Sequence, residues 1–91
     1  MYKLIYTFQF SKKAQKLLKR GVFPINLFKK QLEFLKKDPF YPSLRTHKAE
    51  IKNFGMVYTC SINGEYRIAW DFGQSNEIVL LSIGGHKDIY Q

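Results

Sequence analysis

The chain contains a single cysteine, Cys60, so no disulfide can form within it. Long apolar runs are also missing, because the longest apolar stretch, from Ile78 to Leu81, is far too short to span a bilayer. The first residues alternate in character and lack an apolar segment of signal-peptide length. These absences argue against a cross-linked secreted domain and against a membrane protein, and they predict a protein of the reducing cytoplasm.

Acidic residues are scarce as well. Seven Asp and Glu stand against fifteen Lys and Arg, which leaves a formal charge of +8 on 91 residues. Such a charge attracts polyanions, so we expect nucleic acid, a ribosome or an acidic protein as the partner. The alternative is that the charge only keeps the protein soluble. A chain of this length has room for one modest core, and we expect residues 1–91 to form a single domain.

The N-terminal part predicts a strand and then a helix. Residues 2–8 alternate with a period of two and are rich in aromatic and β-branched side chains, which is typical of a strand. Over residues 11–20 the apolar side chains recur on one helical stripe and lysines occupy the rest. Ser11 is the predicted N-cap of this helix, and Gly21 fits the position just past its end.

A second helix and a less regular segment follow. Pro24 suits the first turn of a helix that continues to about Asp38, with apolar residues at spacings of three and four. Prolines bracket the stretch from Asp38 to His47, which we expect to be irregular. Residues 48–54 carry too little periodicity for a regular element, and we expect a loop with some extended pairing.

The last part predicts a three-stranded antiparallel meander over residues 56–62, 66–72 and 78–84. A two-residue loop at Asn63 and Gly64 would mix polar and apolar side chains on both faces of the first hairpin, whereas a three-residue loop or a bulge separates them. The apolar face then consists of Met56, Tyr58, Cys60, Ile62, Tyr66, Ile68, Trp70 and Phe72.

We predict that the two helices cover this apolar face and that the opposite face is the working surface. Its side chains come from two strands and are Val57, Thr59, Ser61, Arg67, Ala69 and Asp71. The same alternation in the last strand places Ser82 and Gly84 opposite the apolar Val79, Leu81 and Ile83.

Three short segments point to a family. They are residues 42–48 (PSLRTHK), 63–68 (NGEYRI) and 83–90 (IGGHKDIY), and with the order of elements they resemble the RelE/ParE superfamily, particularly its RelE-like and YafQ-like ribonuclease branches. The resemblance covers essentially the whole chain. It implies an α+β fold in which an N-terminal strand and a helical hairpin pack on a twisted antiparallel sheet. It also implies a toxin that a cognate antitoxin neutralises and that cuts mRNA in the ribosomal A site.

RNA can be cut without a metal when its own 2′-hydroxyl attacks the adjacent phosphate, which requires a base, an acid and cationic donors. The resemblance implies a catalytic role for His86 and a functional role for Arg67, whose guanidinium can hold two phosphate oxygens. His47 falls where YafQ-like toxins have a second histidine. The plainer alternatives are an exposed terminal His86, a structural ion pair between Arg67 and Asp71, and an ordinary loop position for His47.

Other residues are candidates for binding the substrate. Tyr90 resembles the C-terminal aromatic residue that many of these toxins place against the substrate base, and packing of the tail is its alternative. Cationic and polar candidates for contacts with RNA are Arg45, Lys48, Lys52 and Ser61. Ser61 and Glu65 depart from the YafQ-like pattern, which has a His and an Asp at these positions.

The sequence gives no sign of a metal or another cofactor. Two His and one Cys at these spacings match no zinc pattern, and Cys60 on the apolar face is expected in the core rather than as a nucleophile. The leading hypothesis is therefore a metal-independent endoribonuclease toxin in a hetero-oligomer with an acidic antitoxin. The alternatives are a ParE-like inhibitor of DNA gyrase without nuclease activity, and an inactive component that only binds an antitoxin or RNA.

Overall fold

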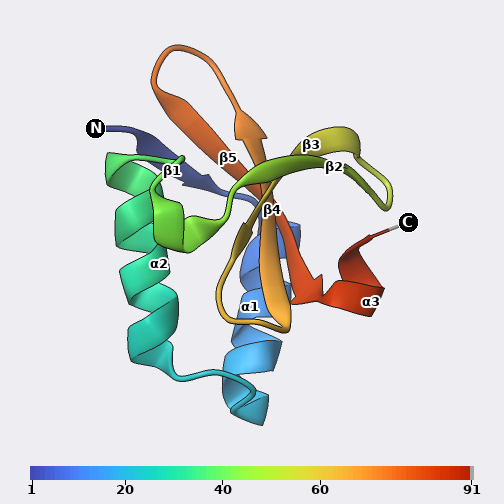
Figure 1. The fold of residues 1–91 in the computed structure, drawn as a ribbon. Helices are drawn as coiled ribbons and strands as arrows, with labels where there is room; N and C mark the ends of the chain where they lie inside the picture. Colours follow the sequence, from blue (N-terminus) through green and yellow to red (C-terminus); the bar gives the residue numbers. More distant parts are fainter. Residues whose placement is uncertain (91) are drawn as a thin grey trace.

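The computed structural model describes residues 1–90, which form one five-stranded sheet and a helical hairpin (Figure 1). The elements are β1 (Lys3–Tyr6), α1 (Phe8–Arg20), α2 (Ile25–Lys37), the 3₁₀ turn η1 (Pro42–Leu44), β2 (His47–Ile51), β3 (Gly55–Ser61), β4 (Tyr66–Phe72), β5 (Glu77–Gly85) and α3 (His86–Ile89). The strand order is β1-β5-β4-β3-β2, with β1 parallel to β5 and the other pairs antiparallel. The predicted α+β architecture is confirmed.

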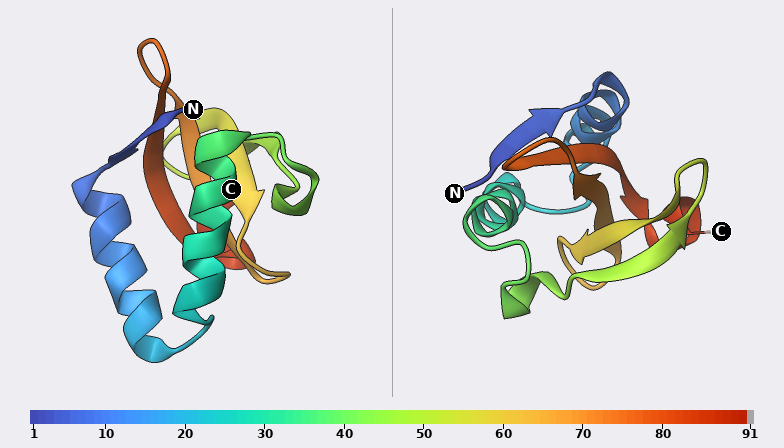
Figure 2. Two further views of the ribbon diagram at one scale, coloured as in Figure 1. Left: turned by 90° about the vertical axis from the view of Figure 1, so that its left-hand side faces the viewer. Right: turned by 90° about the horizontal axis from the view of Figure 1, so that it is seen from above.

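The helices lie on both sides of a strongly twisted sheet. Figure 2 shows α1 and α2 side by side against one face, and α3 on the far side of the sheet from α2. The sheet-facing side chains of α1 and α2 join those of the sheet in the main core. The predicted cover of the apolar face is confirmed for six of its eight residues, which belong to the main core, whereas Met56 and Phe72 at the strand ends are exposed. The other face is left for α3 and the candidate site. No helix within residues 1–90 is long and apolar enough to cross a membrane.

Helix α1 begins earlier than predicted, because Thr7 and not Ser11 is its N-cap. The Thr7 hydroxyl accepts a hydrogen bond from the Phe10 amide at 3.2 Å and donates one to the Leu80 carbonyl at 2.6 Å. Either residue type can cap a helix, and the bond to β5 selects Thr7. At the other end Gly21 has φ +69°, as the predicted helix end requires.

Residues 47–51 form the regular strand β2. The sequence analysis predicted an irregular segment up to His47 and then a loop with some extended pairing, so this part of the prediction is corrected. This edge strand pairs with β3 from His47 opposite Thr59 to Ile51 opposite Gly55. An edge strand with exposed side chains on both faces shows no alternation of apolar residues, so its pairing partner and not its own sequence defines it.

The hairpin between β3 and β4 has the register of a three-residue loop, as predicted. Cys60 lies opposite Ile68, and Ser61 lies opposite Arg67. The side-chain oxygen of Asn63 accepts hydrogen bonds from the amides of residues 65 and 66 at 2.9 and 2.8 Å, which closes the loop. This register puts Thr59, Ser61, Arg67 and Ala69 on one side of the sheet, called the working face below.

Strand β5 contains a bulge at Leu81, which corrects the predicted alternation. The register of β4 on β5 shifts between Ala69 and Trp70, and Leu81 is left without a partner on β4. The extra residue reverses the alternation, so Leu81 packs beside Ala69 on the working face. Of the three apolar residues predicted to share a face, namely Val79, Leu81 and Ile83, only Ile83 belongs to the core under the helices.

Cys60 lies in the main core with no exposed surface, and burial raises the pKa of its thiol to about 12. At pH 8 the thiolate fraction is then roughly 10³-fold smaller than that of an ordinary cysteine. We expect no labelling by a thiol reagent at pH 8 until the protein is unfolded, whereas a Gln15→Cys variant should gain one fast-reacting thiol. Rapid labelling of the folded wild-type chain would contradict this placement.

The raised pKa of Cys60 also has a defined sign for stability. The folded chain keeps a proton that the unfolded chain loses near pH 9. The contribution of the neutral thiol is therefore fully present below about pH 9 and is lost as the pH rises towards 12.

Candidate functional site

Arg67 lies at the centre of the working face, half-buried on β4. Its Nε donates a hydrogen bond to the hydroxyl of Thr59 at 3.2 Å, and its Nη2 donates one to the carbonyl of Arg45 at 2.9 Å. Its hydrogen bonds within residues 1–90 thus go to neutral groups rather than to Asp71. A guanidinium has five N–H donors, so the two on Nη1 remain for a ligand.

The carbonyl of Arg45 reaches the site because of an unusual backbone conformation. Arg45 follows η1 with φ 49° and ψ 46°, a left-handed conformation that costs a non-glycine residue about 1 kcal/mol. The next strand then begins at His47, whose Nδ1 lies 3.2 Å from the Arg45 carbonyl and 3.4 Å from Nη2 of Arg67. This turn gathers a carbonyl, an imidazole and a guanidinium into contact.

The two contacts of His47 Nδ1 exclude each other. A protonated Nδ1 donates to the Arg45 carbonyl, whereas an unprotonated Nδ1 accepts from Arg67. The side chain is exposed, so either state leaves Nε2 on the solvent side free to exchange a proton. An imidazole held in this way can serve as an acid or as a base.

His86 and Tyr90 come from the C-terminal helix α3. The backbone amide of His86 donates to the carbonyl of Glu65 at 3.0 Å, which ties the start of α3 to the β3–β4 loop. The rings of His86 and Tyr90 lie one turn apart with centroids 4.5 Å from each other. His86 is exposed and Tyr90 is half-buried, so the helix presents an imidazole beside an aromatic ring.

Packing on the working face holds α3 in place. Ile89 is 3% exposed and lies in a second apolar cluster with Ile51, Val57 and Ala69. The amide of Lys52 donates to the Ile89 carbonyl at 3.1 Å. The chain end is thus fixed both by burial and by the backbone, which positions Tyr90.

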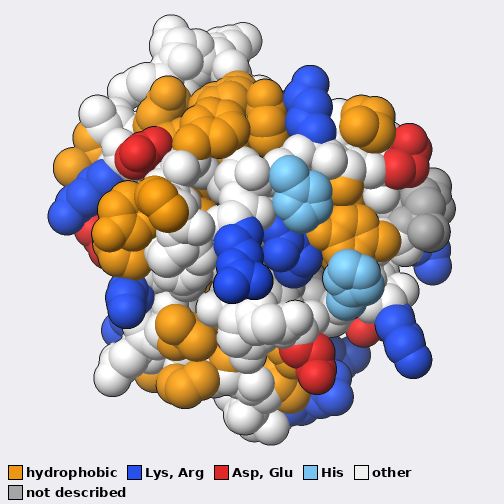
Figure 3. All heavy atoms as spheres, in the orientation of Figure 1, with side chains coloured by type: hydrophobic (Ala, Val, Ile, Leu, Met, Phe, Trp, Pro, Cys, Tyr) orange, Lys and Arg blue, Asp and Glu red, His pale blue; other side chains and the backbone are white. Residues whose placement is uncertain are grey.

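A continuous series of contacts connects the two histidines. The hydroxyl of Thr59 lies 3.0 Å from that of Tyr90, so the contacts run from His47 through Arg67, Thr59 and Tyr90 to His86. Figure 3 shows both imidazoles of the chain on one face of the molecule, beside side chains of Lys or Arg. All three predicted catalytic residues are therefore brought together, with Tyr90 among them.

The four remaining candidates for RNA binding differ in where the structure places them. Lys48 points to the other side of β2, where its Nζ lies 5.4 Å from the centre of the Tyr58 ring. Lys52 is exposed in the turn after β2. Ser61 is 7% exposed, and its hydroxyl donates to the Asn63 carbonyl at 2.6 Å, so it supports the hairpin loop. Arg45 has an exposed side chain beside the carbonyl already described.

The chain matches no protein-family model and no curated protein. Among solved structures, a copper-bound mutant toxin from Helicobacter pylori is 26% identical, with 96% of this chain and 97% of that chain covered and a TM-score of 0.74. YafQ from Escherichia coli is 15% identical, with 96% of each chain covered and a TM-score of 0.76. A YoeB/ParE toxin from Agrobacterium tumefaciens is 13% identical, with 92% and 98% covered and a TM-score of 0.74.

The chain has the RelE/ParE toxin fold. The similarity extends over nearly the full length of each of these toxins, so the shared fold includes both the helical hairpin and the C-terminal strand. The family resemblance predicted from the three sequence segments is confirmed at the level of the fold.

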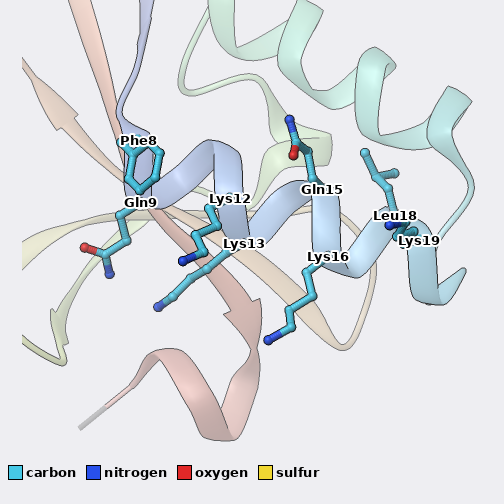
Figure 4. Close-up of a pocket in the computed structure, with 8 residues that line it drawn as sticks. All are labelled: Phe8, Gln9, Lys12, Lys13, Gln15, Lys16, Leu18 and Lys19. Atoms are coloured by element: carbon cyan, nitrogen blue, oxygen red, sulfur yellow. The ribbon is translucent and has the colours of Figure 1, made fainter.

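An open hollow of about 1010 Å³ lies along α1, and neither histidine lines it. Its lining residues are Phe8, Gln9, Lys12, Lys13, Gln15, Lys16, Leu18 and Lys19 (Figure 4). None of them is a candidate site residue. The Nζ of Lys13 donates to the hydroxyl of Ser82 at 3.3 Å, so one of these lysines is held at the edge of β5. The hollow is the basic face of a surface helix rather than a closed pocket.

Two features of the site, the contacts of Thr59 and the backbone turn at Arg45, were not predicted from the sequence. Thr59 was placed on the working face by its alternation, yet its contacts with Arg67 and Tyr90 depend on where the chain end docks. The left-handed turn at Arg45 has no sequence signal, because a glycine or asparagine would be the expected residue there. Within residues 1–90, no group of three or more His, Cys, Asp or Glu side chains is placed to hold a metal ion.

Proposed function

We propose that this protein is the toxin of a type II toxin–antitoxin system and that it cleaves mRNA in the ribosomal A site. The observation that carries the proposal is the pair of imidazoles, His47 and His86, joined by contacts through the guanidinium of Arg67. Binding a protein target alone requires no such group, whereas metal-independent RNA cleavage requires an acid, a base and a cation. The proposed place of action is the cytoplasm, where ribosomes translate.

The proposed reaction is a transfer of the phosphate within the RNA. The 2′-oxygen attacks the adjacent phosphorus and gives its proton to one imidazole, while the bond to the 5′-oxygen breaks and that oxygen takes a proton from the other imidazole. The products are a 2′,3′-cyclic phosphate and a 5′-hydroxyl. Arg67 stabilises the charge that develops on the phosphorane oxygens, through the two N–H groups of Nη1.

The surrounding side chains supply substrate binding in this proposal. Tyr90 offers a ring on which a nucleobase stacks, and its neighbour His86 is then close to the phosphate of the same nucleotide. Around this point the exposed cationic residues Arg45 and Lys52 contact the RNA. Of the other two sequence candidates, Lys48 points to the other side of β2 and Ser61 supports the hairpin loop.

The proposed partner is an acidic antitoxin, in a hetero-oligomer with this chain. Two of the similar structures are complexes of YafQ with DinJ from Escherichia coli, described as a toxin–antitoxin pair. The charge of +8 on this chain favours a partner with acidic residues. Co-expression with an acidic protein encoded beside this gene should restore growth and yield a complex that copurifies.

The test is primer extension on a defined mRNA, incubated with purified protein in the presence and absence of programmed ribosomes. We expect discrete cuts that require ribosomes and that persist in EDTA, since no step uses a metal. A parallel reaction contains added Cu²⁺ in place of EDTA, because a similar toxin is known with bound copper. The two reactions together test whether cleavage depends on a metal. Intact mRNA from a folded protein that still arrests growth would overturn the proposal.

In that event a gyrase supercoiling assay tests the second candidate function. The structural similarity includes a toxin described as YoeB/ParE, and the basic face of α1 is available for a protein or DNA partner on the same fold. Inhibition of supercoiling, unchanged by substitution of both histidines, would establish a gyrase inhibitor instead.

A further inference from the structure

The hydroxyl of Thr59 is a fully buried polar group at the junction of the candidate site. Thr59 has no exposed surface. Its oxygen accepts a hydrogen bond from Nε of Arg67 at 3.2 Å and lies 3.0 Å from the hydroxyl of Tyr90. The oxygen of Thr59 thus connects Arg67, which is proposed to bind the phosphate, with Tyr90, which is proposed to stack on the base.

The hydrogen-bonding capacity of a hydroxyl matches these two neighbours. A threonine hydroxyl has two lone pairs and one proton. Because Nε–H of Arg67 is only a donor, it uses one lone pair of Thr59. Tyr90 then takes the proton of Thr59 or donates to the second lone pair, and in both cases all three polar groups are satisfied.

The position of Thr59 in the sheet makes this junction rigid. Thr59 lies on the central part of β3, paired with His47 on one side and with Ala69 on the other. A β-branched side chain in a strand has a restricted χ1 angle, so its oxygen is held in one direction. The small Ala69 opposite Thr59 belongs to the apolar cluster against which Tyr90 packs.

We propose that Thr59 is a positioning residue that fixes the Arg67 guanidinium and the Tyr90 ring relative to each other. An RNA strand bound there meets a phosphate site and a base site at a set spacing, and cleavage depends on that spacing. The expected effect of Thr59 on cleavage rests on the proposed function. The positioning of Arg67 and Tyr90 by Thr59 is independent of that function, because it is a property of the free protein.

The first measurement concerns the free protein and needs neither RNA nor ribosomes. In an NMR spectrum of uniformly ¹⁵N-labelled protein, we expect the Nε–H of Arg67 to exchange slowly with water in the wild type, because Thr59 holds it. In Thr59→Val, which keeps the shape but lacks the hydroxyl, the exchange should become at least about tenfold faster, and in Thr59→Ser it should stay slow.

The second measurement is the single-turnover rate of mRNA cleavage by the same proteins. Thr59→Val should lower the rate about 10- to 100-fold, the size expected for one hydrogen bond to a charged group, and Thr59→Ser should restore most of it. Tyr90→Phe removes the other bond to the hydroxyl. A double variant of Thr59→Val and Tyr90→Phe should be no slower than Thr59→Val alone.

The outcomes separate the two proposals. Wild-type rates in Thr59→Val, or a lowered rate with unchanged exchange of the Arg67 Nε–H, would overturn the positioning role. If Thr59→Val does not fold, the cleavage rates of Thr59→Ser and Tyr90→Phe test the positioning role instead. A Tyr90→Phe variant that cleaves at the wild-type rate would overturn the proposed link between Thr59 and Tyr90. If the wild-type protein cleaves no RNA, the proposed function fails, while the exchange of the Arg67 Nε–H still decides whether Thr59 holds Arg67.

Discussion

We expect His86→Ala to lower the single-turnover rate of mRNA cleavage by about 10²- to 10⁴-fold, the contribution of a positioned acid or base. The imidazole is exposed at the start of α3, so its removal leaves no buried cavity and no buried polar group without a partner. The loss should therefore appear in the rate and not in the thermal stability. The measurement is primer extension with programmed ribosomes at saturating toxin.

Two matched variants control for the position of α3. Lys87→Ala changes the neighbouring exposed residue of the same helix and should keep the wild-type rate. His86→Gln keeps a polar side chain beside Tyr90 but cannot transfer a proton near neutral pH, so it should be as slow as the alanine variant. Wild-type cleavage by folded His86→Ala would remove His86 from the chemistry and leave His47 as the only imidazole.

Arg67→Ala should lower the same rate by about 10²- to 10³-fold, the effect of removing one donor that stabilises the transition state. We expect Arg67→Lys to restore little of this loss. A lysine keeps the charge, but it lacks the planar fork that bonds Thr59 and the Arg45 carbonyl while leaving Nη1 free. The decisive measurement is the rate at saturating ribosome complex, where weaker binding no longer contributes.

Lys29→Ala, an exposed change on α2, is the control for the loss of one positive charge. It should leave the rate at saturation unchanged. If Arg67→Lys instead cleaves as fast as the wild type, the charge alone matters and the fixed geometry of the guanidinium has no part in catalysis. Such a result would also weaken the case for Thr59 as a positioning residue.

The elements that the sequence predicted well are those whose burial leaves a pattern. The helix up to Gly21 and the register of the β3–β4 hairpin both follow from apolar side chains gathered on one face. The same hairpin pattern placed Arg67 on the working face. The roles proposed for His86 and His47, in contrast, came from the resemblance to a family and not from any pattern in the chain.

The elements that the sequence predicted poorly are those that depend on contacts with residues far away along the chain. The start of α1 at Thr7 depends on a bond to the carbonyl of Leu80, 73 residues away in sequence. Strand β2 has exposed side chains on both faces and exists because β3 offers an edge to pair with. The bulge at Leu81 reverses an alternation that reads as regular in the sequence.

The sequence by itself determined the order of helices and strands, the face of the sheet that the helices cover and the positive charge that favours polyanions, because these follow from composition and local periodicity. The fold class was implied by the resemblance to a family. Only the tertiary structure decided which side chains meet on the open face. The turn at Arg45 and the docking of Ile89 bring two ends of the chain to Arg67 and Thr59. Contacts between residues far apart in sequence depend on backbone direction and packing, and neither leaves a local pattern.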